Sequence, residues 1–168
     1  MSKESPRQKP GEKPAAVAME RPAAAPPVPY EKTILVRDCC LCLHVQRAAR
    51  ILARRFDDAL RPVKLTNGQF SLLMSLNRPQ PAGMASVASL LAMDRTTLTA
   101  ALKPLERRGL VVIAPDPADR RSRLLSLTAE GKKLLASALP IWEGTHADIE
   151  KQLAGDGDRL RKNLLTLA

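Results

Sequence analysis

Apolar residues recur at helical spacing along most of the chain. Residues 34–60 place them in one stripe, made of Leu41, Val45, Ala48, Leu52 and Phe56. Pro62 is expected to end this first long helix. The same spacing predicts further helices over residues 66–76, 85–92, 95–108, 128–153 and 160–167. Thr66, Asp94 and Thr128 stand where three of these helices begin, and their side chains suit an N-cap.

The pattern changes after Gly109, which is placed to end a helix in the left-handed conformation. Residues 110–114 and 123–127 are rich in apolar side chains and predict two strands. The polar segment 115–122 between them predicts the long basic tip of a β-hairpin. A short helix, a tight turn, a second helix and a hairpin thus follow one another. This order predicts a winged helix-turn-helix, a mainly α fold (α+β) with a small β-hairpin wing.

Composition separates a tail from the folded domain. Seven of the 14 prolines lie in residues 1–32, which are predicted to be a disordered, solvated tail. Residues 33–168 form the predicted domain, with a winged helix over about 63–128 and dimerisation helices over about 34–61 and 128–167. The chain is 45% hydrophobic but only 2% aromatic, so its core is expected to consist of packed helices rich in Leu, Ala, Val and Ile.

The charge indicates the class of partner. The chain carries a net charge of +10, which favours a polyanion, and residues 95–123 hold seven basic and three acidic side chains. In a winged helix-turn-helix the second helix enters the major groove, where Arg and Thr bind base edges. The candidate DNA-binding residues of that helix are Arg95, Thr96, Thr97, Thr99 and Lys103. The candidates at the hairpin tip, for the adjacent minor groove, are Arg120, Arg121 and Arg123.

Four segments resemble the MarR family of bacterial transcription regulators, over about residues 37–154. They are LTNGQF at 65–70, DRTTLT at 94–99, LERRGL at 105–110 and the wing at 116–131, which ends in LTAEG. In this resemblance Asp119 matches the wing aspartate that orients the loop arginines, and Arg121 matches the minor-groove arginine. The resemblance implies a homodimeric repressor in the bacterial cytoplasm, associated with the nucleoid. Each subunit would bind half of a pseudo-palindromic site in double-stranded DNA.

The two ends of the domain independently favour a dimer. A single winged helix would leave the apolar side chains at these two ends largely exposed, and a symmetric dimer would bury them. These residues are Leu41, Val45, Leu52, Leu153, Leu160, Leu164 and Leu167. By resemblance, a small and often aromatic effector or an oxidant would release the DNA. Trp142 and His44 are candidates for lining an effector pocket, although a lone Trp on an apolar helix is also typical of a core.

Three cysteines, Cys39, Cys40 and Cys42, lie within four residues and form no disulfide framework, which favours a reducing compartment. On a continuous helix, Cys39 and Cys42 would share a face. Cys42 matches the reactive cysteine of the family's hydroperoxide-sensing branch, but the tyrosines that accompany it there correspond to Gln46 and Phe56. Redox sensing by Cys42 and Cys39, and inert packing, are both open interpretations. His44 lies on a different helix face, so no metal site is predicted.

Other classes of function find less support in the sequence. It contains no glycine-rich phosphate loop and no zinc-protease or nucleophile motif, so neither an enzyme nor a cofactor is predicted. It also contains no run of 18 uncharged apolar residues, so no membrane partner is expected. One alternative is a helical scaffold whose basic faces bind an acidic partner or RNA. Another is a thiol-based redox protein.

Overall fold

The computed structural model describes residues 27–119 and 121–167. The chain divides into two units by its internal contacts, Met1–Cys40 and Leu41–Ala168. The first unit contains helix α1 (Tyr30–Cys39), which has no buried residue. Most of the predicted tail, residues 1–26, lies outside the described residues.

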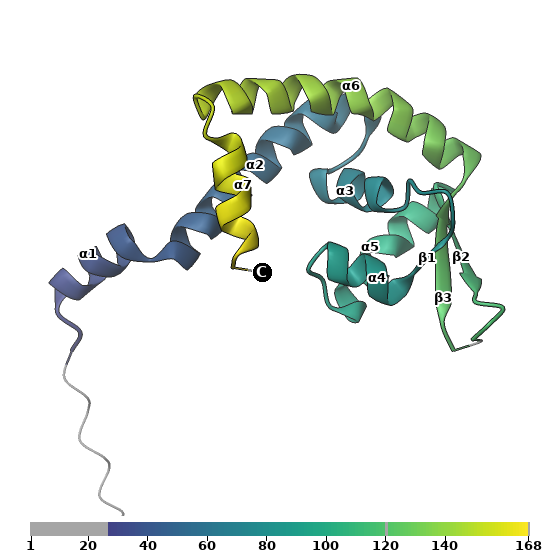
Figure 1. Cartoon of the computed structure of the whole chain (residues 1–168), viewed down its shortest axis with the longest axis horizontal. Helices are drawn as coiled ribbons and strands as arrows, with labels where there is room; N and C mark the ends of the chain where they lie inside the picture. Colours follow the sequence, from purple (N-terminus) through teal and green to yellow (C-terminus); the bar gives the residue numbers. More distant parts are fainter. Residues whose placement is uncertain (1–26, 120, 168) are drawn as a thin grey trace, which may run out of the picture. The chain divides into compact units, whose positions relative to one another are not determined.

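The second unit holds the other elements in the predicted order (Figure 1). Its helices are α2 (Leu41–Leu60), the 3-10 helix η1 (Arg61–Val63), α3 (Asn67–Ser75), α4 (Met84–Leu90), α5 (Arg95–Arg107), α6 (Ala129–Gln152) and α7 (Gly157–Leu165). Its strands are β1 (Ala82–Gly83), β2 (Val111–Pro115) and β3 (Arg123–Leu127). The mainly helical fold with a small wing is therefore confirmed.

The prediction of one helix over residues 34–60 is wrong at Cys40. That residue has an extended backbone, with ψ 105°, and its amide donates to the Val36 carbonyl at 3.0 Å, which ends α1. Because no residue of α1 is buried, no packing energy holds this segment in register with the helix that follows. Amphipathic α2 begins at Leu41 and buries Phe56 and Leu60.

The three predicted N-caps are confirmed. The Thr66 side chain accepts from the Gln69 amide at 3.2 Å, and the Gln69 side chain accepts from the Thr66 amide at 3.1 Å, which completes a capping box. Thr128 accepts from the Gly131 amide at 2.9 Å and donates to the Gly109 carbonyl at 2.7 Å. Thr128 therefore caps α6 and also ties this helix to the turn at the end of α5.

The sheet has three antiparallel strands in the order β1-β3-β2. The predicted hairpin is β2 and β3, which pair from Val111 opposite Leu127 to Pro115 opposite Arg123. Strand β1 lies between the predicted helices 66–76 and 85–92, where the sequence predicts no strand because two residues are too short to show an alternating pattern. It pairs Ala82 with Leu125 and so fixes the hairpin beside α4.

The core is rich in leucine, as composition suggested. Its fully buried side chains are Leu60, Leu72, Leu73, Val87, Leu98, Leu102, Leu105 and Leu125. Helix α6 packs against α2 and α3, and its first turn lies against the base of the hairpin (Figure 1). At that point Gly131 is buried directly against the Leu110 carbonyl, so a side chain at residue 131 would overlap the backbone. The core thus fixes α5 and the wing in one unit.

Candidate nucleic-acid interface

Helix α5 has one face in the core and one in solvent. Leu98, Leu102 and Leu105 are fully buried. The predicted groove-facing side chains are all exposed: Arg95, Thr96, Thr97, Thr99 and Lys103. Four of them, Arg95, Thr96, Thr99 and Lys103, line one shallow surface hollow of about 390 Å³ together with Ala100. The structure therefore brings these four together on one exposed surface of α5.

Thr97 belongs to the cap of the helix rather than to this hollow. The Asp94 carboxylate accepts from the Thr97 amide at 2.8 Å and from the Thr97 hydroxyl at 2.6 Å. Both hydrogen bonds lower the pKa of Asp94 below its ordinary value, and the bond from the Thr97 hydroxyl has the larger effect. The ionised carboxylate stays at the positive end of the helix dipole and fixes the first turn of α5.

The wing tip is organised by two aspartates. Asp119 accepts from the Arg121 amide at 3.0 Å and from the Ser122 hydroxyl at 2.9 Å. The bond from the Arg121 amide is the larger cause of a lowered pKa at Asp119. Asp116 accepts from the Ala118 amide at 2.9 Å, and its own amide donates to the Ser122 carbonyl at 3.1 Å. These bonds within the loop tie both aspartates to its described residues.

Arg121 and Arg123 are both exposed on this ordered hairpin. Arg120, the third predicted wing arginine, lies outside the described residues. Ser122 was not singled out from the sequence, yet its hydroxyl satisfies Asp119. The signal available was its position three residues after the aspartate, which is a common spacing for such turns.

A second hollow joins the helix to the wing. It has a volume of about 270 Å³. Its lining consists of Arg95 of α5, Arg123 of β3, Asp116 and Ser122 of the tip, Gly83 of β1, and Met84, Ala85 and Ala88 of α4. Arg95 and Arg123 are 28 positions apart in the sequence, so only the folded hairpin brings them to one surface. The fold therefore brings one predicted groove residue, Arg95, and one predicted wing residue, Arg123, to the same surface.

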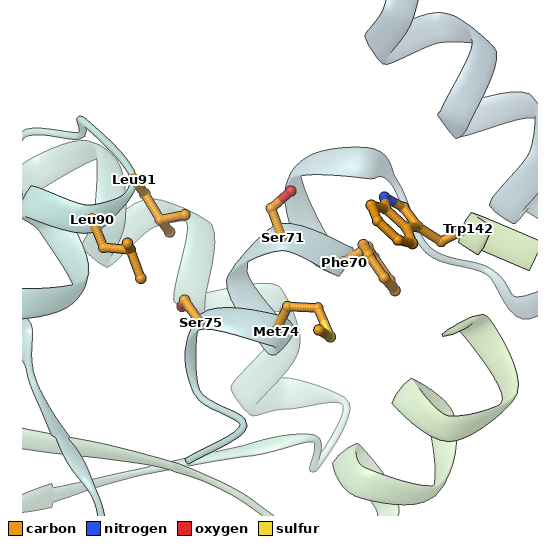
Figure 2. Close-up of a pocket in the computed structure, with 7 residues that line it drawn as sticks. All are labelled: Phe70, Ser71, Met74, Ser75, Leu90, Leu91 and Trp142. Carbon is orange, nitrogen blue, oxygen red and sulfur yellow. The ribbon is translucent and has the colours of Figure 1, made fainter. Parts of the chain in front are cut away.

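An apolar pocket lies on another part of the same unit. It has a volume of about 370 Å³ and is lined by Phe70, Ser71, Met74, Ser75, Leu90, Leu91 and Trp142. Figure 2 shows Phe70 and Trp142 at one end and Leu90 and Leu91 at the other. Trp142 stacks on Phe70 with ring centroids 6.1 Å apart. Trp142 thus lines this pocket, whereas His44, the other candidate for an effector pocket, is not one of its lining residues.

The cysteines do not share a helix face as predicted, because the helix is broken at Cys40. Cys39 is the last residue of α1 and Cys42 the second of α2, and both are exposed. The Gln46 amide donates to the Cys42 sulfur at 3.1 Å. Neither of these two cysteines is packed in the core of the chain. Within residues 27–119 and 121–167, no three potential ligands are grouped as a metal site would need.

Known proteins resemble this chain both in sequence and in fold. A sequence model of the MarR family matches residues 65–122. The organic hydroperoxide resistance transcriptional regulator of Bacillus subtilis is 30% identical over 127 residues, covering 76% of this chain and 86% of the relative. The chain belongs to the MarR family. The regulator HosA of Escherichia coli is 32% identical over 101 residues, covering 60% of this chain and 75% of HosA.

Solved structures of MarR-family proteins match the fold as well. The Mycobacterium tuberculosis regulator MosR, in complex with DNA, has a TM-score of 0.71 and 38% identity. The match covers 76% of this chain and 92% of MosR. The repressor CouR, bound to a 23-mer DNA duplex, has a TM-score of 0.65 and 32% identity, covering 79% of this chain and 92% of CouR. The chain is thus a winged-helix transcriptional regulator of this family.

The helices of the described residues were also compared with the requirements of a membrane span. None of them is both long enough and apolar enough to cross a bilayer.

Proposed function

We propose that this MarR-family chain is a homodimeric repressor of an inverted-repeat operator in double-stranded DNA. The observation that carries the proposal is the surface on which Arg95 of α5 and Arg123 of β3 line one hollow. A major-groove helix and a minor-groove wing must act on adjacent stretches of one duplex, and this arrangement presents both together. The DNA complexes of the relatives MosR and CouR support the same use of the fold.

The residues of this surface have distinct proposed roles. Arg95, Thr96 and Thr99 contact base edges in the major groove, with Lys103 on the phosphates. Arg121 enters the minor groove, with Arg120 and Arg123 as neighbours on the phosphates, while Asp119 holds the loop that carries them. Thr97 acts mainly through the cap with Asp94. The proposed function of this surface is therefore to bind DNA, without catalysis and without a cofactor.

The pocket beside Trp142 is the proposed effector site. Its lining contains no ionisable side chain, and its polar groups include the Ser71 and Ser75 hydroxyls. The Ser75 hydroxyl already donates to the Leu72 carbonyl at 2.7 Å. Because an anion would be buried there without a countercharge, the pocket favours an uncharged aromatic ligand over a carboxylate.

Thiol oxidation is the second proposed trigger. It is favoured by the exposure of Cys39 and Cys42 and by the Gln46 amide bonded to the Cys42 sulfur. Gln46 supplies an N–H donor where a tyrosine hydroxyl stands in the hydroperoxide-sensing branch.

Selection of genomic fragments by the purified protein tests the proposal. The selection is done with and without peroxide, using wild type and Cys42→Ser. Enrichment of a shared inverted repeat supports the repressor, and sequence-independent capture of DNA or RNA would support a basic scaffold instead. Loss of enrichment with peroxide in wild type but not in Cys42→Ser would assign the trigger to that thiol. If peroxide has no effect on wild type, the thiol trigger is wrong.

A further inference from the structure

Three of the four Phe, Trp and Tyr side chains gather at one place, around Trp142. The sequence holds only two Phe, one Trp and one Tyr. Phe56 of α2 and Phe70 of α3 both stack on Trp142 of α6, with ring centroids 6.4 and 6.1 Å away. The His146 ring, one helical turn further along α6, stacks on Trp142 at 4.7 Å with an interplanar angle of 26°. Trp142 is therefore held from three elements, and it also lines the pocket.

His146 in turn contacts a glutamate that reaches another helix. Its Nε2 lies 3.5 Å from Oε1 of Glu150, again one turn further along α6. The same Glu150 oxygen accepts from Nη1 of Arg161 on α7, and Nη2 of Arg161 pairs with Asp158. Trp142, His146 and Glu150 thus form a row along one face of α6 that ends on an arginine of α7.

The first residue of α7 packs on the same carboxylate. Gly157 is buried, and a Cβ added there would overlap the Glu150 carboxylate. The Glu150 side chain therefore occupies the space beneath the first turn of α7, and a Cβ at residue 157 would displace its carboxylate. Leu160 and Leu164 of α7, and Leu167 beyond its end, are exposed and are among the predicted dimerisation residues.

We infer that Glu150 and His146 are positioning residues that couple the seating of α7 to the orientation of Trp142 in the pocket wall. Arg161 holds Glu150, Glu150 holds the His146 ring, and the ring covers one face of the indole. A change in the dimer that displaces α7 breaks these contacts. The Trp142 side chain then becomes more mobile. The contacts alone support this coupling between α7 and Trp142, whereas an effect on effector binding rests on the proposed function.

Trp142 is the only tryptophan in the sequence, so its fluorescence reports this site in the full chain. The measurement is acrylamide quenching for wild type, Glu150→Gln, Arg161→Gln and Gly157→Ala. Each variant is expected to raise the quenching constant roughly twofold, because the indole loses one stacked face to the solvent. Gly157→Ala is the most telling variant, since it displaces Glu150 without removing a charge and alanine favours a helix.

Two controls separate positioning from general effects. Asp148→Asn makes the same charge change on α6 as Glu150→Gln, in an exposed pair with Lys151, and is expected to leave quenching unchanged. In a His146→Phe background, which keeps a ring against Trp142, Glu150→Gln is expected to have no further effect. Additive effects in that background would show that Glu150 does not act through His146.

The inference is overturned if Gly157→Ala and Glu150→Gln leave quenching at the wild-type value, or if Asp148→Asn changes it equally. DNA binding is measured in parallel by gel shift. A wild type that binds no DNA would contradict the proposed function, yet the quenching comparison would still decide the coupling. The two failures are therefore distinguishable.

Discussion

At the scale of single residues, Asp119 determines what the wing can present. It bonds the Arg121 amide and the Ser122 hydroxyl, so the arginine side chain projects from a fixed backbone. A loop ordered before binding loses less conformational entropy when it enters a groove. The affinity contributed by Arg121 therefore depends on a residue that need not contact DNA.

Replacing Arg121 by alanine tests the groove contact. The variant is expected to weaken operator binding by about 1–3 kcal/mol, the range of a good groove contact. Gel shifts against the selected operator measure the change, with Lys151→Ala, at the far end of α6, as the matched loss of one positive charge. Equal affinity of Arg121→Ala and wild type would show that the wing is assigned wrongly.

The titration of Asp119 tests the order of the loop. Because its pKa is lowered in the folded state, the stabilisation from its hydrogen bonds is fully present above the pKa of the unfolded chain, about 3.9. It is lost as the pH falls through the lower, folded pKa. The NMR resonance of the Arg121 amide should therefore titrate with a midpoint below about 3.9. In Asp119→Ala this titration should vanish, and a midpoint above the ordinary aspartate value would contradict the hydrogen bonds.

At the scale of elements, local chemistry could be predicted and long-range contacts could not. The caps of α3, α5 and α6 follow from pairs three residues apart, such as Asp94 with Thr97, and these are visible in the sequence. The stack of Phe56 on Trp142 joins residues 86 positions apart, and β1 exists only because β3 pairs with it. The apolar stripe begins only at Leu41, so it carries no signal for the break at Cys40.

The close approach of α6 to the hairpin is tested by two alanine substitutions on one helix. Gly131→Ala places a methyl group against the Leu110 carbonyl and should cost about 1–3 kcal/mol or more. Gly144→Ala, in the same helix with open space around it, should stabilise the protein by about 0.5–1 kcal/mol. Urea unfolding measures both. If the two substitutions change stability equally, α6 does not pack on Leu110 as described.

At the scale of the whole molecule, the described chain leaves apolar side chains exposed on the helices predicted to dimerise. Val45 and Leu52 of α2 and Leu160 and Leu164 of α7 are each about 40% exposed. The charge on α5 and the wing would be doubled across two half-sites by a symmetric dimer. Dimerisation therefore both covers this apolar surface and sets the length of the operator.

Leu164→Asp tests this assembly. A buried aspartate would oppose association, so the variant should sediment as a monomer in analytical ultracentrifugation. Its operator affinity should fall by roughly 10²–10⁴-fold, the usual contribution of a second linked site. Lys162→Gln makes the same change of net charge on another face of α7 and should remain dimeric. A Leu164→Asp protein that is still dimeric would exclude this face from the interface.

The most direct test of the central claim is a hydroxyl-radical footprint on the selected operator. A symmetric pair of winged helices should protect two half-sites about 10 base pairs apart, flanked by protected minor grooves where the wings lie. In Arg121→Ala the protection of the flanking minor grooves should disappear, while the protection of the two half-sites remains. A footprint without two-fold symmetry, or one identical in wild type and Arg121→Ala, would contradict the account.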